Sequence, residues 1–182
     1  MSDAASTPPA QAPAPPMAPA PVQPGAVPAF VGLGANLGDA AGAIGRSLAA
    51  LSALPQTRLV RQSPLYRSAP VDASGPDFIN AVAELLTGLS PDALLAELQR
   101  LEQAEGRERP YRNAPRTLDL DLLIHGEIHA QVRLDTPRLT LPHPRMSERA
   151  FVLRPLADIA PGRVTAAQLQ AVAHQFIERL AP

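Results

Sequence analysis

Residues 115–125 read Pro-Arg-Thr-Leu-Asp-Leu-Asp-Leu-Leu-Ile-His and place two carboxylates inside an otherwise apolar run. From Leu118 onward apolar and polar residues alternate, which predicts a β-strand because successive side chains of a strand point to opposite faces. We expect one face to carry Asp119 and Asp121, and the opposite face to carry the apolar residues Leu118, Leu120, Leu122 and Ile124. The strand therefore has one face for a core and one face for chemistry.

Asp119 and Asp121 are candidate metal ligands. Their Cα atoms are expected roughly 6.5–7 Å apart on a strand, where two anions beside a core repel each other and resist desolvation. A divalent cation removes this repulsion, and Mg²⁺ usually takes one or two protein carboxylates and fills its shell with water and phosphate oxygens. Arg116, three residues upstream, adds a guanidinium suited to phosphate. The alternative is a strand with one solvated face, but aspartate is depleted in strands, which favours the metal site.

The overall composition excludes several mechanisms. The 182 residues have room for one domain with a substantial core, and a net charge of −1 argues against a general binder of nucleic acid or membrane surfaces. The sequence contains neither lysine nor cysteine, so a phosphate-loop lysine, Schiff-base chemistry, thiolate zinc sites and disulfides are excluded. Any bound nucleotide must therefore be held by arginine.

The N-terminal part differs in composition from the rest. Residues 1–28 are mostly Pro and Ala, and they offer few amide donors and little apolar surface. We predict a disordered tail there, with a proline-rich ligand for a partner domain as the alternative, and a folded domain over residues 29–182. No apolar run approaches the ~20 residues of a membrane helix, and no secretory signal pattern is present. We therefore expect a cytoplasmic protein.

The folded part is expected to alternate strands with helices. An apolar run at 29–31 predicts a strand that enters a glycine-rich turn, although the glycine spacing does not match the dinucleotide-binding fingerprint. Further strands are predicted over 57–66, 77–86 and 128–134, and helices over 40–54, 91–105 and 165–180. In the strand over 77–86, Asn80 shares a face with Phe78, where its amide either binds a ligand or bonds to neighbouring backbone.

The segment before the aspartates is unusually basic. Four arginines, Arg107, Arg109, Arg112 and Arg116, fall within ten residues that two prolines interrupt. The simple alternative is a solvated loop, but its position next to two acidic strand residues favours a mobile clamp for anions. His125 and His129 have the spacing of a helical zinc pair, but Gly126 and the preceding strand pattern argue against a helix there.

Further short motifs occur in a fixed order around the Pro115–Leu122 signature. They are Gly34-Ala35-Asn36-Leu37-Gly38, Leu65-Tyr66-Arg67-Ser68, Phe78-Ile79-Asn80-Ala81, Leu101-Glu102 with Gly106-Arg107, Leu141-Pro142-His143, and Arg149-Ala150-Phe151. With these motifs the chain resembles the 6-hydroxymethyl-7,8-dihydropterin pyrophosphokinase family from about Phe30 to Gly162. That resemblance implies an α+β, ferredoxin-like fold with a mainly antiparallel central sheet and helices packed on it.

The resemblance also implies an activity and a set of site residues. It implies ATP-dependent transfer of a pyrophosphoryl group to 6-hydroxymethyl-7,8-dihydropterin in folate biosynthesis, with two Mg²⁺ ions at Asp119 and Asp121 and catalytic roles for Arg107 and Arg116. It implies ATP contacts from Arg109, Arg112, Arg138, Thr140, His143 and Arg149. It implies a pterin pocket at Ser68, Ala69, Val71, Phe78, Asn80 and Phe151.

The chain departs from close relatives at Asn113-Ala114, where they often carry Trp-Gly, so aromatic packing from that loop is absent. We expect a monomer that acts on small molecules and binds neither nucleic acid nor membranes. The competing hypothesis is a ferredoxin-like module that binds a nucleotide or metabolite without turnover. The aspartate pair together with Arg107 and Arg116 favours the enzyme.

Overall fold

The computed structural model describes residues 24–71, 75–106 and 116–181. A βαββαβ unit comes first in the chain, and it consists of β1 (Val27–Ala35), α1 (Ala40–Ser52), β2 (Thr57–Gln62), β4 (Phe78–Thr87), α2 (Pro91–Ala104) and β5 (Asp119–Glu127). A short strand precedes β4, and the C-terminal part adds smaller elements: β3 (Tyr66–Ser68), β6 (Ala130–Gln131), β7 (Leu134–Asp135), β8 (Thr140–Leu141), η1 (Met146–Glu148), α3 (Ala150–Ile159), η2 (Pro161–Arg163), α4 (Ala166–Ala171) and β9 (Ile177–Arg179).

The main sheet has the strand order of a ferredoxin-like fold. Within the βαββαβ unit the order is β5-β1-β4-β2, and every neighbouring pair is antiparallel. The strand β3 pairs with the start of β4, on the same edge as β2, and β9 pairs with β3; β6 pairs with the end of β5. The predicted α+β fold with an antiparallel central sheet is therefore confirmed.

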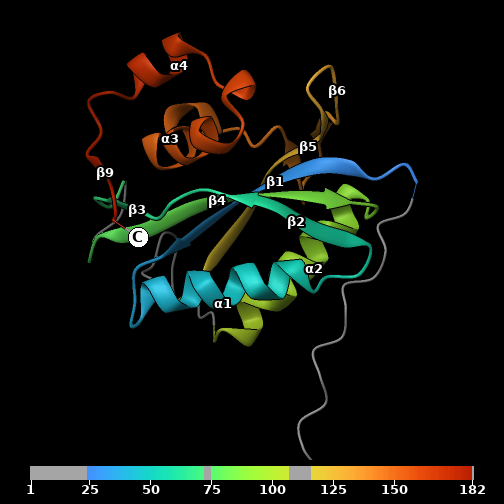
Figure 1. Ribbon diagram of the computed structural model, residues 1–182, viewed down its shortest axis with the longest axis horizontal. Helices are drawn as coiled ribbons and strands as arrows, with labels where there is room; N and C mark the ends of the chain where they lie inside the picture. Colours follow the sequence, from blue (N-terminus) through green and yellow to red (C-terminus); the bar gives the residue numbers. More distant parts are fainter. Residues whose placement is uncertain (1–23, 72–74, 107–115, 182) are drawn as a thin grey trace, which may run out of the picture.

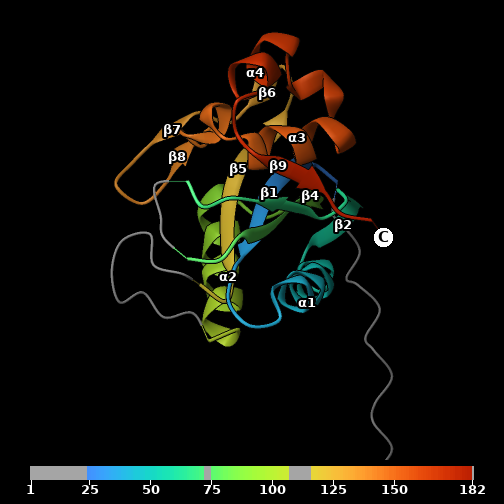
Figure 2. The same cartoon turned by 90° about the vertical axis from the view of Figure 1, so that its left-hand side faces the viewer.

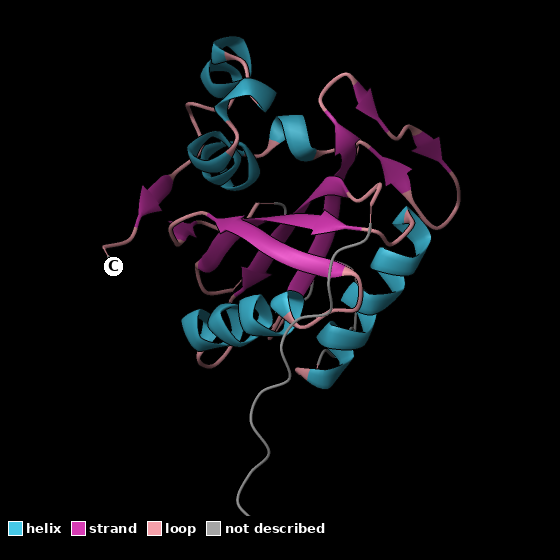
Figure 3. Cartoon of the chain, turned by 45° about the vertical axis from the view of Figure 1, so that its right-hand side comes forward, coloured by secondary structure: helices cyan, strands magenta, loops and turns pink. Residues whose placement is uncertain are grey.

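Helices cover both faces of this sheet. Figures 1 and 3 show α1 and α2 on one face and α3 with α4 on the other, and Figure 2 shows the β7–β8 hairpin beside β5. One apolar cluster lies between the sheet and the pair α1 and α2, and a second lies between the sheet and α3. None of the helices within the described ranges is both long and apolar enough to cross a membrane.

Local sequence explains the first two helices. The Asp39 carboxylate accepts a bond from the Gly42 N–H at 3.0 Å and caps α1, and the Ser90 hydroxyl accepts one from the Ala93 N–H at 3.3 Å and caps α2. Pro91 occupies the first helical position of α2, where its missing N–H has no cost. Gly106 follows α2 with a φ of +75°, as the predicted end of that helix requires. Both predicted helices exist, ending at Ser52 and Ala104.

The glycine-rich turn predicted after Val31 is strand in its first half, and the chain bends only at residues 37–39, where Gly38 has a φ of +60°. Gly32 and Gly34 are paired on both sides, with β4 and with β5, so β1 continues to Ala35. Val31, Leu33 and Ala35 point into the first apolar cluster, and the two glycines therefore face the side of α3. β1 also begins at Val27, two residues before the predicted start of the domain. Residues 1–23 of the predicted tail lie outside the described part.

The predicted strand over 57–66 is divided into β2 and β3. The division falls at Ser63 and Pro64. The Ser63 N–H still donates to the Val82 carbonyl at 2.9 Å, but the Val82 N–H donates to the Ser63 hydroxyl at 3.0 Å. Pro64 has no amide hydrogen to donate to a sheet, which explains the interruption. In the following strand the predicted alternation is confirmed, because Ala81 lies in the first cluster and Val82 in the second.

The strand β5 follows the prediction from Asp119 to Leu122 and then departs from it. Its register with β1 shifts between Phe30 and Val31, so Leu123 has no residue opposite it in β1. After the shift, Leu123 and Ile124 both belong to the cluster under α3. The prediction that Ile124 shares a face with Leu118, Leu120 and Leu122 is therefore wrong, and the irregular register is the reason.

The C-terminal part contains the largest errors of prediction. The Thr165–Gln168 capping box exists, but α4 ends at Ala171 and not near Leu180. Residues 177–179 form β9 instead, because they pair with the open edge of β3. The helix α3 was not predicted, since Pro155 lies inside it. The strand predicted over 128–134 is present only as the short β6, and β7 begins at its last residue.

Candidate active site

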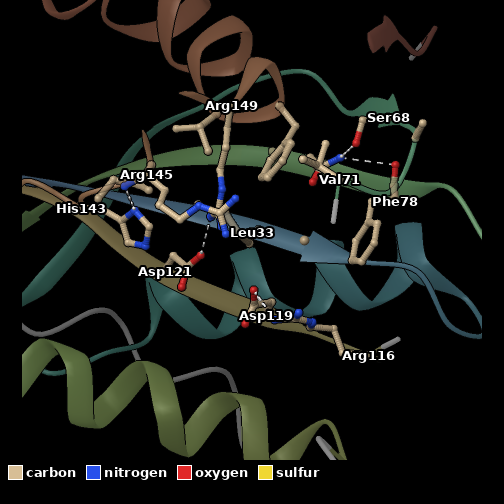
Figure 4. A pocket seen from close by; sticks show the side chains of 18 residues that line it. Leu33, Ser68, Val71, Phe78, Arg116, Asp119, Asp121, His143, Arg145 and Arg149 are labelled. Carbon is tan, nitrogen blue, oxygen red and sulfur yellow. Dashed lines mark hydrogen bonds and ion pairs between the residues drawn. The ribbon is translucent and has the colours of Figure 1, made fainter. Parts of the chain in front are cut away.

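A cleft opens on the face of the sheet that α3 covers, and Figure 4 shows it from close by. Residues from β1, β3, β4, β5, the segment before α3 and the start of α3 line it. They are Gly32, Leu33, Gly34, Ser68, Ala69, Val71, Phe78, Asn80, Ala81, Arg116, Asp119, Asp121, Leu123, His143, Arg145, Arg149, Phe151 and Val152. Charged groups gather at one end and aromatic and apolar groups at the other.

The register of three strands sets the floor of the cleft. Gly34 of β1 is paired with Asn80 of β4 and with Asp119 of β5. Two residues earlier, Gly32 lies between Val82 and Asp121 in the same way. A Cβ atom at position 34 would lie 3.4 Å from the Asn80 Oδ1 atom. Because the glycines carry no side chains, the cleft runs uninterrupted from the amide on β4 to the carboxylates on β5.

Asp119 and Asp121 point into the cleft from β5, as their alternation predicts (Figure 4). The Asp119 carboxylate lies 2.7 Å from the Arg116 guanidinium, and the Asp121 carboxylate lies 3.9 Å from that of Arg149. These partners reduce the repulsion between the two carboxylates. The charged end therefore combines two anions with cations that can also contact phosphate.

Two buried side chains fix the backbone that carries this charged end. The Asn36 carbonyl accepts a bond from the Arg116 N–H at 2.9 Å, and its amide donates to the Pro76 carbonyl at 3.2 Å. The Glu102 carboxylate of α2 accepts a bond from the Leu120 N–H at 2.7 Å, between the two aspartates. Both side chains are at least 95% buried. The sequence motifs containing Asn36 and Glu102 therefore support the site without lining it.

His143 adds a neutral donor to the charged end. Its backbone N–H donates to the Leu123 carbonyl at 2.8 Å, and its Nδ1 accepts a bond from the Arg145 N–H at 3.2 Å. With Nδ1 as acceptor, the proton of the neutral ring lies on Nε2. Burial, and then the positive charge of Arg149, lower the pKa of His143. The ring is therefore neutral near pH 7 and offers one N–H to an anion.

Arg149 connects the two ends of the cleft. It immediately precedes α3, and its guanidinium carbon lies 5.4 Å from the centre of the Phe151 ring. Burial, and then the like charge of Arg145, lower the pKa of Arg149. An anion between the two guanidinium groups would relieve this repulsion.

The other end of the cleft offers ring faces and one amide. Phe78 and Phe151 line it with Ala69 and Val71, while the Asn80 amide donates to the Ser68 hydroxyl at 3.0 Å. Asn80 also donates to the Phe78 carbonyl at 3.3 Å, so its orientation is fixed. Of the two alternatives weighed for Asn80, the local hydrogen bonds are present, and the binding of a ligand by this cleft-lining residue stays a prediction. Such an end fits a flat heteroaromatic ring.

The residues present fit a divalent cation. Asp119 and Asp121 supply hard oxygen ligands on one strand face, and the open cleft beside them leaves room for water and phosphate oxygens. Across the described residues, no group of three or more His, Cys, Asp or Glu side chains could hold a metal ion. A site at the two aspartates would therefore depend on ligands from the substrate, as is usual for Mg²⁺.

Most of the residues predicted for the site lie together. The cleft is lined by eleven of them, namely Arg116, Asp119, Asp121, His143, Arg149, Ser68, Ala69, Val71, Phe78, Asn80 and Phe151. Arg138 and Thr140 lie in the β7–β8 hairpin and are not among the lining residues, while Arg107, Arg109, Arg112 and Asn113-Ala114 fall outside the described residues. Arg145 lines the cleft but was not predicted as a site residue. Its place in the basic Pro142–Arg149 segment could have indicated this role.

The fold is α+β, and its cleft places arginine and aspartate side chains near two aromatic rings. The sequence model of the family described as 7,8-dihydro-6-hydroxymethylpterin-pyrophosphokinase matches residues 30–161. The chain belongs to this family.

Individual relatives agree with the family match. The chain is 48% identical over 158 residues to the 2-amino-4-hydroxy-6-hydroxymethyldihydropteridine pyrophosphokinase of Pseudomonas aeruginosa, covering 83% of this chain and 95% of that protein. It is 44% identical over 133 residues to the enzyme of the same name from Haemophilus influenzae, covering 72% and 81%.

Solved structures support the fold alone. A crystal structure of an HPPK-DHPS in complex with substrates superposes with a TM-score of 0.59 at 13% identity, covering 81% of this chain and 43% of that one. The HPPK-DHPS of Plasmodium falciparum gives a TM-score of 0.53 at 12% identity, covering 73% and 39%. The chain therefore spans less than half the length of these two solved proteins.

Proposed function

We propose that this chain transfers the β,γ-pyrophosphoryl group of ATP to the hydroxymethyl group of 6-hydroxymethyl-7,8-dihydropterin. The pterin hydroxyl attacks the β-phosphorus, the bond from that phosphorus to the α-phosphate oxygen breaks, and AMP leaves. The main support for this proposal is the arrangement of the cleft. Arginine and aspartate side chains line one end, aromatic side chains line the other, and Gly32 and Gly34 of β1 lie between them. The family match supports the same substrates.

In this proposal Asp119 and Asp121 hold two Mg²⁺ ions. When bound, the ions supply positive charge that neutralises the phosphate oxygens during transfer. The two carboxylates are paired with Arg116 and Arg149 in the structure, so these arginines are already beside the expected position of the polyphosphate. Positions that are fixed in advance cost no rearrangement at the moment of reaction.

The arginines bind and stabilise the transferred group. Arg116 and Arg107 are proposed as catalytic residues, because planar guanidinium groups can follow the charge that develops on phosphate oxygens. His143 would donate its Nε2–H to a phosphate oxygen, which agrees with its lowered pKa and its bonded Nδ1. Additional ATP contacts are proposed for Arg149 and for the residues that the structure does not bring to the cleft or does not describe: Arg109, Arg112, Arg138 and Thr140.

The pterin is proposed to lie over Gly34, next to Phe78, Asn80 and Phe151. Asn80 uses its amide hydrogens on Ser68 and on the Phe78 carbonyl, which leaves Oδ1 as an acceptor toward the cleft. The edge of a pterin carries N–H donors that match such an acceptor. Ser68, Ala69 and Val71 complete this side of the pocket.

A coupled assay of AMP release tests the proposal. With ATP, Mg²⁺ and the pterin present, AMP should form, and omission of any one of them should abolish it. AMP formation without pterin would contradict the assignment, and nucleotide binding without turnover would support the non-catalytic module. The proposal includes a monomeric protein in the cytoplasm, which light scattering and cell fractionation can test.

A further inference from the structure

The side-chain amide of Gln175 holds the backbone on both sides of Arg149. Its Oε1 accepts a bond from the Ala150 N–H at 2.8 Å, and its Nε2 donates to the Glu148 carbonyl at 2.7 Å. We propose that Gln175 is a positioning residue for the transfer reaction, which acts through Arg149 and Phe151 without contacting a substrate. This inference rests on the proposed function of the cleft.

The start of α3 needs a cap that its own sequence does not provide. Arg149 is the residue before the helix, and its side chain makes no capping bond. Its carbonyl already accepts bonds from Val152 and Leu153 at 3.1 and 3.0 Å. The first N–H groups of a helix otherwise lack partners. Gln175 supplies the partner for Ala150, so both peptide groups that flank Arg149 are fixed.

Fixing this point of the backbone orients two parts of the cleft at once. Arg149 projects toward Asp121 at the charged end, and Phe151, two residues later, lines the ring-binding end. A change in the first turn of α3 would therefore displace both groups. Displacements of about 1 Å at a distance from the chemistry can lower a rate by about 100-fold.

Gln175 is itself held in place. Val172 is 3% exposed and packs against Ala150 and Leu153 of α3. The Gln175 N–H donates to the Val172 carbonyl at 3.0 Å, and β9 begins two residues later along the edge of β3. The side chain that caps α3 is therefore fixed on both sides along the chain.

Gln175 lies outside the candidate active site. It is not among the residues that line the cleft, and it lies beyond residue 161, where the family match ends. The role follows from two hydrogen bonds to the backbone and not from a motif.

Two substitutions and one control test the role. Gln175→Met keeps the length of the side chain and removes both bonds, while Gln175→Glu keeps an acceptor for the Ala150 N–H and loses the donor to Glu148. The control is His174→Ala at the exposed neighbouring position. For each protein we would measure amide hydrogen exchange without substrates, kcat and KM for ATP and pterin, and the folded fraction by circular dichroism.

We expect the Ala150 amide of Gln175→Met to exchange about 2- to 13-fold faster, which corresponds to the loss of one hydrogen bond. We expect its kcat/KM to fall about 10- to 100-fold with higher KM for both substrates, with a smaller loss for Gln175→Glu and none for His174→Ala. Unchanged kinetics in the Met variant would overturn the proposal. A fall in kcat that matches the loss of folded protein, with KM unchanged, would also overturn it. If Gln175→Met does not fold, the same criteria are applied to Gln175→Glu.

Hydrogen exchange, together with titration by a non-hydrolysable ATP analogue, separates this inference from the proposed function. If the unsubstituted chain releases no AMP, the proposed function fails, whereas faster exchange at Ala150 and weaker binding of a non-hydrolysable ATP analogue would still support Gln175. If the unsubstituted chain is active and Gln175→Met matches it, only the inference fails.

Discussion

Replacement of Gly34 by alanine should weaken pterin binding and stabilise the fold. Gly34 lies in the middle of β1, between Asn80 and Asp119, and its φ is not positive. A new Cβ would lie 3.4 Å from Asn80 Oδ1 and 4.0 Å from Phe78 Cδ1, which are ordinary contacts in the absence of ligand. Alanine in a strand interior is favoured over glycine by about 0.5–1 kcal/mol. The melting temperature should therefore rise by about 1–4 °C.

The same methyl group occupies the floor on which the pterin ring is proposed to lie. Inserting a methyl group into a closely packed space costs about 1–3 kcal/mol. The pterin dissociation constant should therefore rise by a factor of about 5–150. A non-hydrolysable ATP analogue should bind with much less change, because the new Cβ lies within 4 Å of Asn80 and Phe78 and of no atom of Asp119 or Asp121.

Calorimetric titration with each ligand, together with thermal melting, measures these effects. The matched control is Gly45→Ala, because Gly45 lies on the exposed side of α1 with no atom within 4 Å of a new Cβ. This control should also raise the melting temperature and leave both affinities unchanged. Normal pterin affinity in Gly34→Ala would refute the position of the ring, and equal losses for both ligands would indicate a general distortion of the cleft.

Three further predictions concern charged and titratable groups. Asp119→Asn and Asp121→Asn should each remove most AMP release at saturating Mg²⁺, with unfolding free energies within about 1–2 kcal/mol of the parent chain in urea titrations; a near-normal rate would exclude the metal role. Arg116→Ala should raise the barrier by about 3–4 kcal/mol; tenfold weaker ATP binding at unchanged kcat would instead make it only a binding contact. Burial lowers the pKa of His125 below its ordinary value of 6.5, so the unfolded chain binds more protons as the pH falls below 6.5 and stability decreases. His125→Gln should reduce this loss, which is at most about 1.4 kcal/mol per pH unit, and an equally steep decline in melting temperature from pH 7.5 to 5.5 would contradict this account.

Local sequence predicted the elements whose stability is local. The caps at Asp39 and Ser90 marked α1 and α2, and alternation placed Asp119 and Asp121 on the cleft face of β5. Alternation also placed Asn80 correctly on β4. In these cases the signal lies in the same short segment as the structure that it predicts.

The remaining parts depend on partners far away in the sequence. Residues 177–179 have a helical pattern but pair with β3, because an open strand edge offers more hydrogen bonds than a short isolated helix. Gly32 and Gly34 were expected in a turn, and only pairing on both sides makes them the floor of a cleft. Arg145 reaches the cleft only because the segment that carries it is anchored to β5 through His143.

The pairing of β9 with β3 has a consequence for biosynthesis. Arg67 and Glu178, which form an ion pair across these strands, are separated by 111 positions in the chain. At about 5–20 residues per second, a ribosome needs about 6–22 s to make that interval. During this time β3 has one unpaired edge, which is a surface that other nascent chains can join. The outer edge of β3 is therefore closed only after β4, β5, α3 and α4 have been made.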